Sequence, residues 1–523
     1  MAPRRDDRPP LTLGTAGHID HGKTALVNVL TGRNTDRLPE ERSRGISIEL
    51  GYAPLELPSG RRLSVVDVPG HERFVRTMVA GASGVDMFLV CVAADDGVMP
   101  QTREHMAVLR QLGVTDGAIA ITKADLGDPQ LAAEEATELV PGAPVVPVSA
   151  VAGTGLDDLR TALDAVASRL PGRAGEDGPV RLHVDRSFTL RGIGTVVTGT
   201  LWSGEVATGD PVRVLPRGLT ARVRSVQVHD QPVERAAAGQ RVALNLAGVG
   251  WREVGRGDVV TTADAHLRSG YLLDARVALE PHGRLLRRGA RVHVHHGTRV
   301  APARVAPLEG DELAPGSSGL AQLRLEAPLV ALAGDRLILR QVAPPDTIGG
   351  GVVVDAAPRK HGARAEVVER LRAIERGEPV AADEPSAPPV REVAAEPEPL
   401  DDAALALAAL LRADGTAPRA DADLASAAGL DERAAELRLG RLRRAGQAVR
   451  VARNLHFHPE PLAELEARVV ALCERDGQVT IAGLRDELGS SRKIAQAVLE
   501  YLDRTRVTRR DGDAHVLRRA SGA

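Results

Sequence analysis

Short apolar segments alternate with amphipathic segments through the first third of the chain. The apolar segments LTLGTAG, RLSVVDV, DMFLVCVA, GAIAITK and APVVPVSA have the length of buried strands. Stretches with helical periodicity lie between them, near 22–31, 101–112, 130–140 and 155–169. Alternating strands and helices predict a mostly parallel sheet with helices on both faces. Residues 1–171 are therefore predicted to form an α/β domain.

A different pattern follows, in which many short strands are separated by glycine-rich turns. The change comes at PGRAGEDGP, residues 171–179, which is a predicted linker. RLHVDRSFTL, GTVVTGTL, RVALNLAG and RVHVHHG are examples of the strands beyond it. Two antiparallel barrels of about 85–90 residues each fit this pattern. We place them at 179–263 and 266–357.

The last part of the chain returns to amphipathic helices. It is preceded by residues 376–400, which are rich in Pro, Ala and Glu and predict a flexible acidic linker. Residues 401–459 and 460–523 each show helices followed by short strands, and the second ends in a hairpin that turns at Asp-Gly. The predicted fold class is a multidomain chain, with an α/β domain, two β-barrels and C-terminal winged-helix modules.

Composition narrows the class of protein. A net charge of −3 over 523 residues gives no bulk attraction to nucleic acid, so any such binding must be local. The two cysteines, Cys91 and Cys473, are far apart and exclude a disulfide framework, and Cys91 is predicted to be a buried thiol. No apolar run reaches the ~18 residues of a membrane span, and the N-terminus lacks the apolar core of a signal peptide. These features predict a cytoplasmic protein without membrane contact.

A phosphate-binding loop is predicted at GHIDHGKT, residues 17–24, because the motif follows a strand and opens a helix. Lys23 would reach the β- and γ-phosphates, and the Thr24 hydroxyl would bind Mg²⁺. Lys23 is one of only four lysines in the chain, and arginine does not replace a compact ammonium in such a loop. The alternative, in which Gly17 and Gly22 only form a turn, is disfavoured by this context.

Three further segments follow in the order expected of a GTPase. In DVPGHE, Asp67 at a strand end can hold Mg²⁺ through water, and the Gly70 N–H can meet the γ-phosphate. In TKAD, Asp125 can accept from two donors of guanine that adenine lacks, so the predicted nucleotide is GTP. The SA pair at 149–150 supplies a backbone donor for the guanine carbonyl. The predicted GTP-binding residues are Gly17, His18, Ile19, Asp20, His21, Gly22, Lys23, Thr24, Ala25, Asp67, Pro69, Gly70, Thr122, Lys123, Asp125, Ser149 and Ala150.

Residues 10–355 resemble the translational GTPases, the family of the elongation factors, in GHIDHGKT, RGISIE (44–49), DVPGHE and TKAD. The resemblance implies ribosome-stimulated hydrolysis of GTP to GDP and phosphate. It implies that His71 positions the attacking water and that Ile19 and Ile46 form a hydrophobic gate around that water.

The same resemblance implies a Mg²⁺ site formed by Thr24, Ser47 and Asp67, with Ser47 standing where threonine is usual. Thr122 stands where asparagine is commonest, which makes its contact with the phosphate loop less certain. Asp20 is implied to hold a monovalent cation, and a helix-capping carboxylate is the alternative.

Within that family the chain resembles the selenocysteine-specific elongation factors, the SelB family, in the segments HVDRSFTLRGIGTVVTGTLWSG (183–204) and TIGGGVVVDAAPRKHG (347–362). The resemblance implies delivery of selenocysteinyl-tRNA to the ribosome at recoded UGA codons. It implies that Asp185, Arg186 and Arg241 form a pocket for the readily ionised selenol. A seryl group would leave such a cationic site uncompensated. The alternative is a salt bridge on the barrel surface between Asp185 and an arginine.

Cations cluster near the C-terminus, in SRKIAQAVLEYLDRTRVTRR, residues 491–510. Six cations stand against Glu500 and Asp503 there, which predicts phosphate binding, and a solvated helix face is the alternative. The SelB resemblance implies that this last winged helix binds a hairpin in selenoprotein messenger RNA. The predicted RNA-binding residues are Ser491, Arg492, Lys493, Tyr501, Arg504, Arg509 and Arg510.

Relatives usually have four winged-helix modules, whereas two are legible in this sequence. Residues 401–459 are interpreted as a spacer or as a module that contacts tRNA. The predicted cofactors are GTP or GDP and Mg²⁺, and the predicted partners of a monomer are selenocysteinyl-tRNA, the ribosome and the messenger RNA hairpin.

Three other functions fit parts of the sequence. One is a general tRNA carrier with an unrelated tail, and another is a nucleic-acid-binding regulator in which the GTPase half is a scaffold. The third is a sulfate-activating enzyme subunit on the same GTPase plan. A scaffold has no need of His71, and the sulfate-activating enzyme should lack a winged-helix tail.

Overall fold

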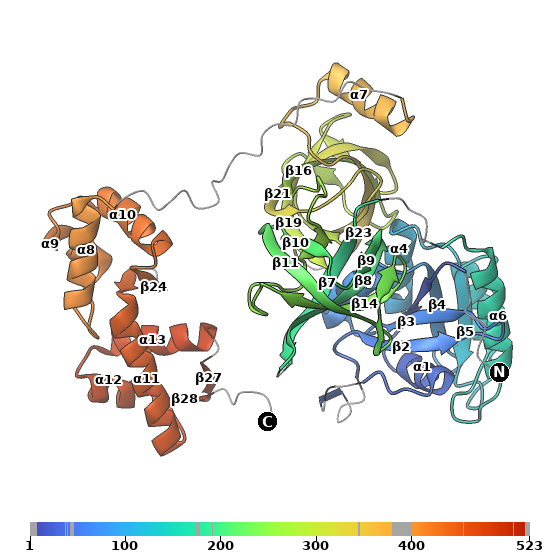
Figure 1. Cartoon of the computed structure of the whole chain (residues 1–523), viewed down its shortest axis with the longest axis horizontal. Coiled ribbons are helices and arrows are strands. Elements are labelled where there is room, and N and C mark those ends of the chain that lie inside the picture. Colours follow the sequence, from blue (N-terminus) through green and yellow to red (C-terminus); the bar gives the residue numbers. More distant parts are fainter. Residues whose placement is uncertain are drawn as a thin grey trace. The chain divides into compact units, whose positions relative to one another are not determined.

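The computed structural model describes residues 8–36, 38, 40–41, 46–172, 178–190, 192–343, 346–378, 400–452, 454–505 and 507–517. The chain divides into two compact units, Met1–Pro389 and Val390–Ala523, and each is described by itself (Figure 1). Residues 379–399 of the predicted acidic linker lie outside the described residues.

A six-stranded sheet in the order β2-β3-β1-β4-β5-β6 forms the centre of the N-terminal domain. All neighbours pair in parallel except β2, which runs antiparallel to β3 at the edge. The strands are β1 (Leu11–Ala16), β2 (Gly51–Glu56), β3 (Arg62–Asp67), β4 (Met87–Ala93), β5 (Gly117–Thr122) and β6 (Val145–Pro147). The helices are α1 (Lys23–Thr31), η1 (Glu72–Phe74), α3 (Val75–Ala82), α4 (Pro100–Gln111), α5 (Gln130–Leu139) and α6 (Leu156–Arg169). The predicted α/β fold is confirmed.

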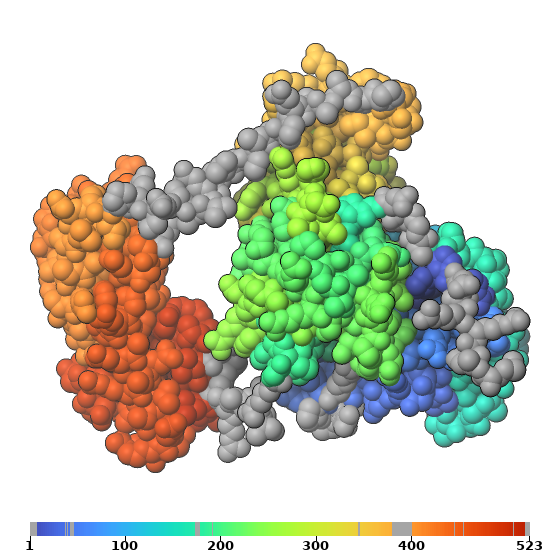
Figure 2. Space-filling view, viewed as in Figure 1, coloured from blue at the N-terminus to red at the C-terminus, as the bar shows by residue number. Residues whose placement is uncertain are grey.

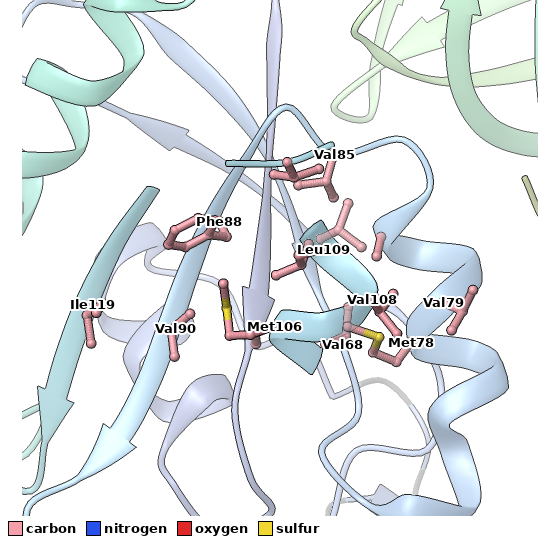
Figure 3. Close-up of a cluster of buried hydrophobic side chains, with 14 of the residues drawn as sticks. Val68, Met78, Val79, Val85, Phe88, Val90, Met106, Val108, Leu109 and Ile119 are labelled. Carbon is pink, nitrogen blue, oxygen red and sulfur yellow. The ribbon is translucent and has the colours of Figure 1, made fainter. Parts of the chain in front are cut away.

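Helices cover both faces of this sheet, and each face has its own apolar core. Met78 of α3 and Met106 of α4 belong to one core, shown in Figure 3, which also contains Phe88 of β4. Leu26 of α1 and Leu159 of α6 belong to the core on the opposite face. Every residue of β4 is buried, as expected for a central parallel strand.

Cys91 lies within β4 and is 0% exposed. Burial raises the pKa of its thiol to about 12, which keeps the thiol protonated at neutral pH. The prediction of a buried thiol is confirmed.

The next domain is a barrel that closes through the pairing of β10 with β11. Along β14 the side chains alternate, so that Val242, Leu244 and Leu246 point into the core. Arg241 and Asn245 therefore project from the outer face. The strands are β7 (Arg181–Leu190), β8 (Gly194–Ser203), β9 (Glu205–Ala207), β10 (Pro211–Leu215), β11 (Leu219–Val228), β12 (Gln231–Val233), β13 (Arg235–Ala237), β14 (Arg241–Ala247) and β15 (Val259–Thr262).

A second closed barrel follows, in the order β16-β21-β19-β18-β22-β23. The helix α7 (Ala365–Glu375) packs on its outside through the buried Leu371, and this helix was not predicted. The strands are β16 (Gly270–Leu279), β17 (Leu286–Arg287), β18 (Arg291–His296), β19 (Arg299–Pro307), β20 (Glu312–Leu313), β21 (Ser318–Leu329), β22 (Arg336–Gln341) and β23 (Thr347–Asp355).

Both barrels contact the N-terminal domain. The Thr12 hydroxyl donates to the Gly239 carbonyl of the first barrel at 3.0 Å, and Figure 2 shows that barrel, in green, against the blue N-terminal domain. Arg340 of the second barrel pairs with Glu104 of α4 at 3.0 Å. The first barrel, where the aminoacyl pocket was predicted, also lies beside residues of strands β2 and β3.

The C-terminal unit contains two modules of three helices and a β-hairpin. The first consists of α8 (Asp402–Ala413), α9 (Asp421–Ala427), α10 (Glu432–Arg444), β24 (Val449–Ala452) and β25 (Leu455–Phe457). The second consists of α11 (Pro459–Asp476), β26 (Val479–Thr480), α12 (Ile481–Leu488), α13 (Arg492–Arg504), β27 (Thr508–Asp511) and β28 (Ala514–Leu517). The sheet order β26-β28-β27 confirms the predicted C-terminal winged helix.

The two modules share an apolar core. Val451, Leu455 and Phe457 of the first hairpin pack with Leu465 and Val498 of the second module. The packing of the second module therefore includes residues of the first module. None of the described helices is both long and apolar enough to cross a lipid bilayer.

Candidate functional site

The predicted phosphate loop connects β1 to α1 at the edge of the sheet where parallel strands end. Gly17, Asp20 and Gly22 all have positive φ, at 131°, 62° and 71°. A Cβ on Gly17 would collide with the Cys91 carbonyl oxygen, so only glycine fits there. The N-cap of α1 is Gly22 and no side chain caps this helix end, so the capping role considered for Asp20 is wrong. The first N–H groups of α1 are therefore open to an anion.

Lys23 folds its ammonium back over this loop and is only 6% exposed. Its Nζ donates to the Gly17 carbonyl at 3.0 Å and to the His18 carbonyl at 2.5 Å. Burial lowers the pKa of Lys23, and the nearby Asp67 opposes this shift. A Cβ on Gly70 would collide with the same ammonium. The Lys23 ammonium and Gly70, both predicted to contact the γ-phosphate, therefore lie against each other.

His105 of α4 forms a hydrogen bond with the phosphate loop, and this contact was not predicted. Its Nδ1 accepts from the Gly17 N–H at 3.2 Å. Burial lowers the pKa of this histidine to about 3, with Lys23 and His18 adding to the shift, so the ring stays neutral and can accept. A histidine on a helix carries no local sequence signal for such a contact.

Three hydroxyl groups converge on the carboxylate of Asp67, which is 1% exposed at the end of β3. Thr24 and Thr35 donate to Oδ2, each at 2.8 Å, and Thr15 donates to Oδ1 at 2.9 Å. Burial raises the pKa of Asp67, and the hydrogen bonds from these hydroxyls oppose the rise. The arrangement fixes the carboxylate beside the phosphate loop.

Ser47 joins this group and brings the predicted metal set together. Its Oγ lies 2.9 Å from Thr24 Oγ1 and donates to Asp36 Oδ1 at 2.8 Å. Hydroxyl and carboxylate oxygens are the ligands that Mg²⁺ prefers, with phosphate and water completing the shell. No group of three His, Cys, Asp or Glu side chains in the described part of the chain could hold a metal. The donor set therefore fits an ion shared with a nucleotide.

Thr35 and Asp36 were missed from the sequence, as was the carboxylate that organises their loop. Glu41 is 2% exposed and accepts from the N–H groups of Leu38, Ile48 and Glu49, each at 2.9 Å. Glu41 thereby holds the backbone of Ile48 and Glu49, next to the Ser47 that lies beside Thr24. Such polar loop residues have no periodic pattern that would mark them.

His71, the predicted catalytic residue, directly follows Gly70 and is half-buried. It is the N-cap of η1, where its Nδ1 accepts from the Arg73 N–H at 3.2 Å. In this arrangement the neutral ring carries its proton on Nε2. Ile19 and Ile46, the predicted gate, are both half-buried, and Gly70 lies against the Ile19 backbone.

The TKAD segment ends β5 and touches the phosphate loop. The Thr122 hydroxyl donates to the His21 carbonyl at 2.9 Å, so threonine makes a contact with the loop at the position where asparagine is commonest. Lys123 has a positive φ of 55°, and its Nζ lies 3.1 Å from Asp95 Oδ2. The TKAD segment and the phosphate loop, two parts of the predicted nucleotide site, are therefore connected.

The predicted guanine-reading residues lie on adjacent loops. Asp125 is exposed in the turn after β5. The Ala124 N–H donates to the Val148 carbonyl at 3.1 Å, which ties this turn to the segment that carries the buried Ser149 and the half-buried Ala150. Asp125 and the SA pair are thus brought to one side of the sheet.

Replacing Asp125 by asparagine is expected to shift the preference from guanosine towards xanthosine nucleotides, because an amide can donate to the second carbonyl of xanthine. Competition between GDP and XDP for the variant measures the shift. Asp128→Asn, at another exposed carboxylate three residues later, is the matched control and should leave the preference for GDP intact. An unchanged preference in Asp125→Asn would mean that Asp125 does not contact the base.

Asp185 and Arg241 form a two-contact ion pair on the first barrel. Arg241 Nη1 lies 2.5 Å from Asp185 Oδ2, and Nη2 lies 3.0 Å from Oδ1. The salt bridge between Asp185 and an arginine that was considered as the alternative is therefore present, although only 12% of the Arg241 side chain and 6% of the Asp185 side chain are exposed. Burial favours a lower pKa for Arg241, but Asp185 outweighs it and the pKa is raised.

Arg186 points from the same strand towards the N-terminal domain. Its Nη2 donates to the Leu50 carbonyl at 2.6 Å and lies 3.1 Å from Glu49 Oε2. Arg186 and Arg241 both line a cavity of about 310 Å³ between the first barrel and strands β2 and β3. The structure therefore brings two of the three predicted pocket residues to the wall of one cavity, which Tyr52 of β2 also lines, and Asp185 contacts that wall through Arg241 and Tyr52.

The predicted RNA-binding residues fall into two groups. The Ser491 hydroxyl caps α13 by accepting from the Ile494 N–H at 3.3 Å, and the side chains of Arg492, Lys493, Arg509 and Arg510 are exposed. Arg504 instead donates to the Val451 carbonyl of the first module at 3.0 Å and lies 5.4 Å from the centre of the half-buried Tyr501 ring. Arg504 thus ties the two modules together, which sequence spacing could not show.

Four segments of the chain match known domain families. Residues 9–169 match the elongation factor Tu GTP-binding domain, and residues 194–261 match elongation factor Tu domain 2. Residues 274–360 match the β-barrel domain of the selenocysteine-specific elongation factor. Residues 471–517 match the winged helix of elongation factor SelB.

Whole-chain comparisons point to the same proteins. The chain is 32% identical to the selenocysteine-specific elongation factor of Escherichia coli (strain K12), over 98% of this chain and 99% of that protein. It is 42% identical to the factor of Desulfomicrobium baculatum, over 70% of this chain but only 59% of that protein. A crystal structure of a bacterial selenocysteine-specific elongation factor covers 98% of this chain with 25% identity and a TM-score of 0.64. Translation elongation factor SelB from Methanococcus maripaludis, in complex with the GTP analogue GppNHp, covers 68% of this chain and 80% of its own, with 27% identity and a TM-score of 0.60.

Proposed function

The chain belongs to the family of selenocysteine-specific elongation factors, and from this premise we propose that it carries selenocysteinyl-tRNA to the ribosome in a GTP-dependent way. The delivery takes place at recoded UGA codons, while the last winged helix holds a hairpin of the messenger RNA. The N-terminal domain is a translational GTPase that binds guanine nucleotides.

The N-terminal site binds GTP, and hydrolysis of this GTP is coupled to delivery of the tRNA. Lys23 and the N–H groups at the start of α1 neutralise the phosphates. Thr24, Ser47 and Asp67 would hold Mg²⁺, which would supply positive charge to offset that developing on the phosphate oxygens. His71 orients the attacking water from the position beside Gly70.

The first barrel selects the amino acid through its charge. A selenol ionises more readily than a serine hydroxyl, so the selenocysteinyl group presents an anion where serine presents a neutral dipole. Arg241 remains cationic inside the cavity because Asp185 raises its pKa, and Arg186 adds a second guanidinium. A neutral occupant offers these guanidinium groups no further charge to bind, whereas a selenolate does, which disfavours seryl-tRNA.

The observation that carries this proposal is the buried Asp185–Arg241 pair at the wall of a cavity that also contains Arg186. A general tRNA carrier needs no cationic pocket at the amino acid. The monomeric state and the cytoplasmic location remain predictions.

Replacing Arg241 by alanine is expected to weaken binding of selenocysteinyl-tRNA by about 1–3 kcal/mol, the scale of a charge-assisted hydrogen bond. Seryl-tRNA binding should barely change, because serine brings no charge to the pocket. Arg186→Ala should also weaken binding of selenocysteinyl-tRNA. Dissociation constants of both tRNAs, measured on the GTP-bound protein, give the result.

Arg235→Ala is the matched control, because Arg235 is an exposed arginine of the same barrel that pairs with Glu205 at 2.9 Å. It should leave both affinities unchanged. Equal losses for the two tRNAs in Arg241→Ala would assign this arginine to the barrel structure or to the tRNA backbone. A wild-type protein that binds both tRNAs equally would favour the general carrier.

A further inference from the structure

The C-terminal unit contains a cavity of about 390 Å³ at the junction of its two modules. Its walls come from α9, α10 and the β24–β25 hairpin of the first module and from the first turn of α13 in the second. The residue that α13 contributes is Lys493, one of the predicted RNA-binding residues. The cavity therefore adjoins the exposed cations at the start of α13.

Charged side chains of both signs line this cavity. Glu432, Glu436 and Arg443 lie along one face of α10, and Lys493 adds a second cation from α13. All four side chains are exposed, and within the part of the chain that the structure describes none of them takes part in an ion pair or a hydrogen bond. The two cations can therefore bind a phosphate, and the two carboxylates can accept from N–H groups of a ligand.

Gly440 lies on the same face of α10, between Glu436 and Arg443. A glycine in the interior of a helix is destabilising by roughly 0.5–1 kcal/mol relative to alanine. A Cβ on Gly440 would have no neighbouring atom within 4 Å, so no packed neighbour among the described residues requires a glycine here. The missing side chain instead leaves the cavity open between the carboxylates and Arg443.

A buried histidine holds the wall that α9 and the hairpin form. His456 is 5% exposed, and its Nδ1 lies 2.9 Å and 3.0 Å from the two carboxylate oxygens of Asp421. The Asp421 N–H also donates to the Asn454 carbonyl at 3.2 Å. Nε2 of His456 has no hydrogen-bond partner within the described residues. These contacts join α9 to the hairpin, so the wall is formed before a ligand binds.

A nucleotide combines the two kinds of group that these side chains can bind. Its phosphate is an anion, and its base presents N–H groups at its edge. A surface that binds only the phosphate backbone would not carry Glu432 and Glu436 beside Arg443, because carboxylates repel phosphate. The bases of a paired stem are stacked inside the helix, whereas an unpaired base can be turned out and bound by its edge.

We propose that this cavity binds one unpaired nucleotide of the same messenger RNA hairpin that contacts α13. The phosphate lies at Arg443 and Lys493, and the base edge lies at Glu432 and Glu436. This inference rests on the proposed function. The first module then takes part in reading the RNA, instead of acting as a spacer or as a module that contacts tRNA.

Filling the cavity tests the proposal without removing any charge. Gly440→Leu places a side chain in the open space, so the affinity of the full-length protein for the selenoprotein hairpin should fall by about tenfold or more, the scale of one charge-assisted hydrogen bond. Ala406→Leu, at an exposed position of α8 outside the cavity, is the matched control and should bind as the wild type does. Arg443→Gln should make the slope of log affinity against log salt less steep by about 0.7–0.9.

A second measurement shows whether the lost contact is a contact with a base. Hairpins that carry an abasic site at each unpaired position in turn are bound to the wild type and to Gly440→Leu. One such replacement should weaken binding to the wild type and have no further effect in Gly440→Leu, because both changes remove the same contact. If thermal unfolding shows that Gly440→Leu does not fold, Gly440→Met takes its place, because methionine is an unbranched helix former.

A loss of less than about threefold in Gly440→Leu would overturn the inference. A larger loss that adds to the effect of every abasic site would overturn it as well, since the cavity would then contact no base. Failure of the proposed function gives a different result: the wild-type protein itself would not bind the hairpin. A wild type that binds the hairpin, together with a Gly440→Leu variant that binds it equally well, rejects only the role of the cavity.

Discussion

Replacing His71 by alanine is expected to slow ribosome-stimulated GTP hydrolysis by about 10²–10⁴-fold and to leave GTP affinity unchanged. The imidazole follows Gly70, which lies against the Lys23 ammonium, so the ring begins at the γ-phosphate end of the site. Among the described residues, the His71 ring accepts a hydrogen bond from the Arg73 N–H and lies near the Phe74 ring. Neither residue belongs to the predicted nucleotide-binding set. Single-turnover hydrolysis with saturating ribosomes measures the chemical step directly.

His71 also has a structural role, which requires a control. Its Nδ1 caps η1 by accepting a hydrogen bond from the Arg73 N–H. Loss of a cap costs about 0.5–2 kcal/mol of stability and could misplace the segment. His71→Asn keeps a favoured capping residue and removes the imidazole, so it should be as slow as His71→Ala. His282→Ala, at an exposed histidine of the second barrel, should hydrolyse GTP at the wild-type rate. Wild-type turnover in His71→Asn would show that the ring acts only as a cap.

The nucleotide site was largely predictable because its parts are local in sequence. A phosphate loop requires fixed spacing between Gly17, Gly22 and Lys23, and each further motif directly follows an apolar strand. Parallel strands deliver these loops to the same edge of the sheet, so the motif order alone predicts their meeting. The Thr122 hydroxyl reaches the phosphate loop for the same reason.

Residues that act through long-range contacts were not predictable. Glu41 and Thr35 lie in a segment without helix or strand periodicity, and their importance comes from backbone groups and a carboxylate that folding brings near. Tyr52 reads as an ordinary residue of an edge strand, because nothing in GYAPLE shows that a barrel residue 133 positions later lies beside it. The same holds for α7, whose buried Leu371 finds its partners on strands of the second barrel.

The C-terminal winged helix contains both features that were predictable from the sequence and features that were not. Its three helices and hairpin follow from apolar spacing and from the Asp-Gly turn, and Ser491 caps α13. His515, one of the few aromatic side chains of this module, is only 4% exposed and its Nδ1 lies 2.9 Å from Asp503, which removes it from any base-stacking surface. Phosphate contact rather than stacking is therefore the stronger expectation for this surface.

Removing Arg492 and Lys493 together is expected to abolish hairpin binding by the full-length protein. Both are exposed in the first turn of α13, and Arg509 and Arg510 are exposed on the adjacent strand β27. Each phosphate that a cation neutralises adds about 0.7–0.9 to the slope of log affinity against log salt, so four contacts predict a slope near −3. The double variant should make the slope less steep by about 1.5. This slope is measured at the salt concentrations where residual binding is still detectable.

A matched control separates local contacts from net charge. Arg475 and Arg485 lie in the same module, and each pairs with the acidic residue that follows it, at 2.7 Å and 2.6 Å. Replacing both with alanine removes the same two charges but leaves the α13 surface intact, so hairpin affinity and salt slope should stay near wild type. GTP hydrolysis should be unaffected in both double variants, because the nucleotide site belongs to the other unit of the chain. Equal weakening in the two double variants, or equal affinity for unstructured RNA, would show that the cations on α13 are only a solvated face.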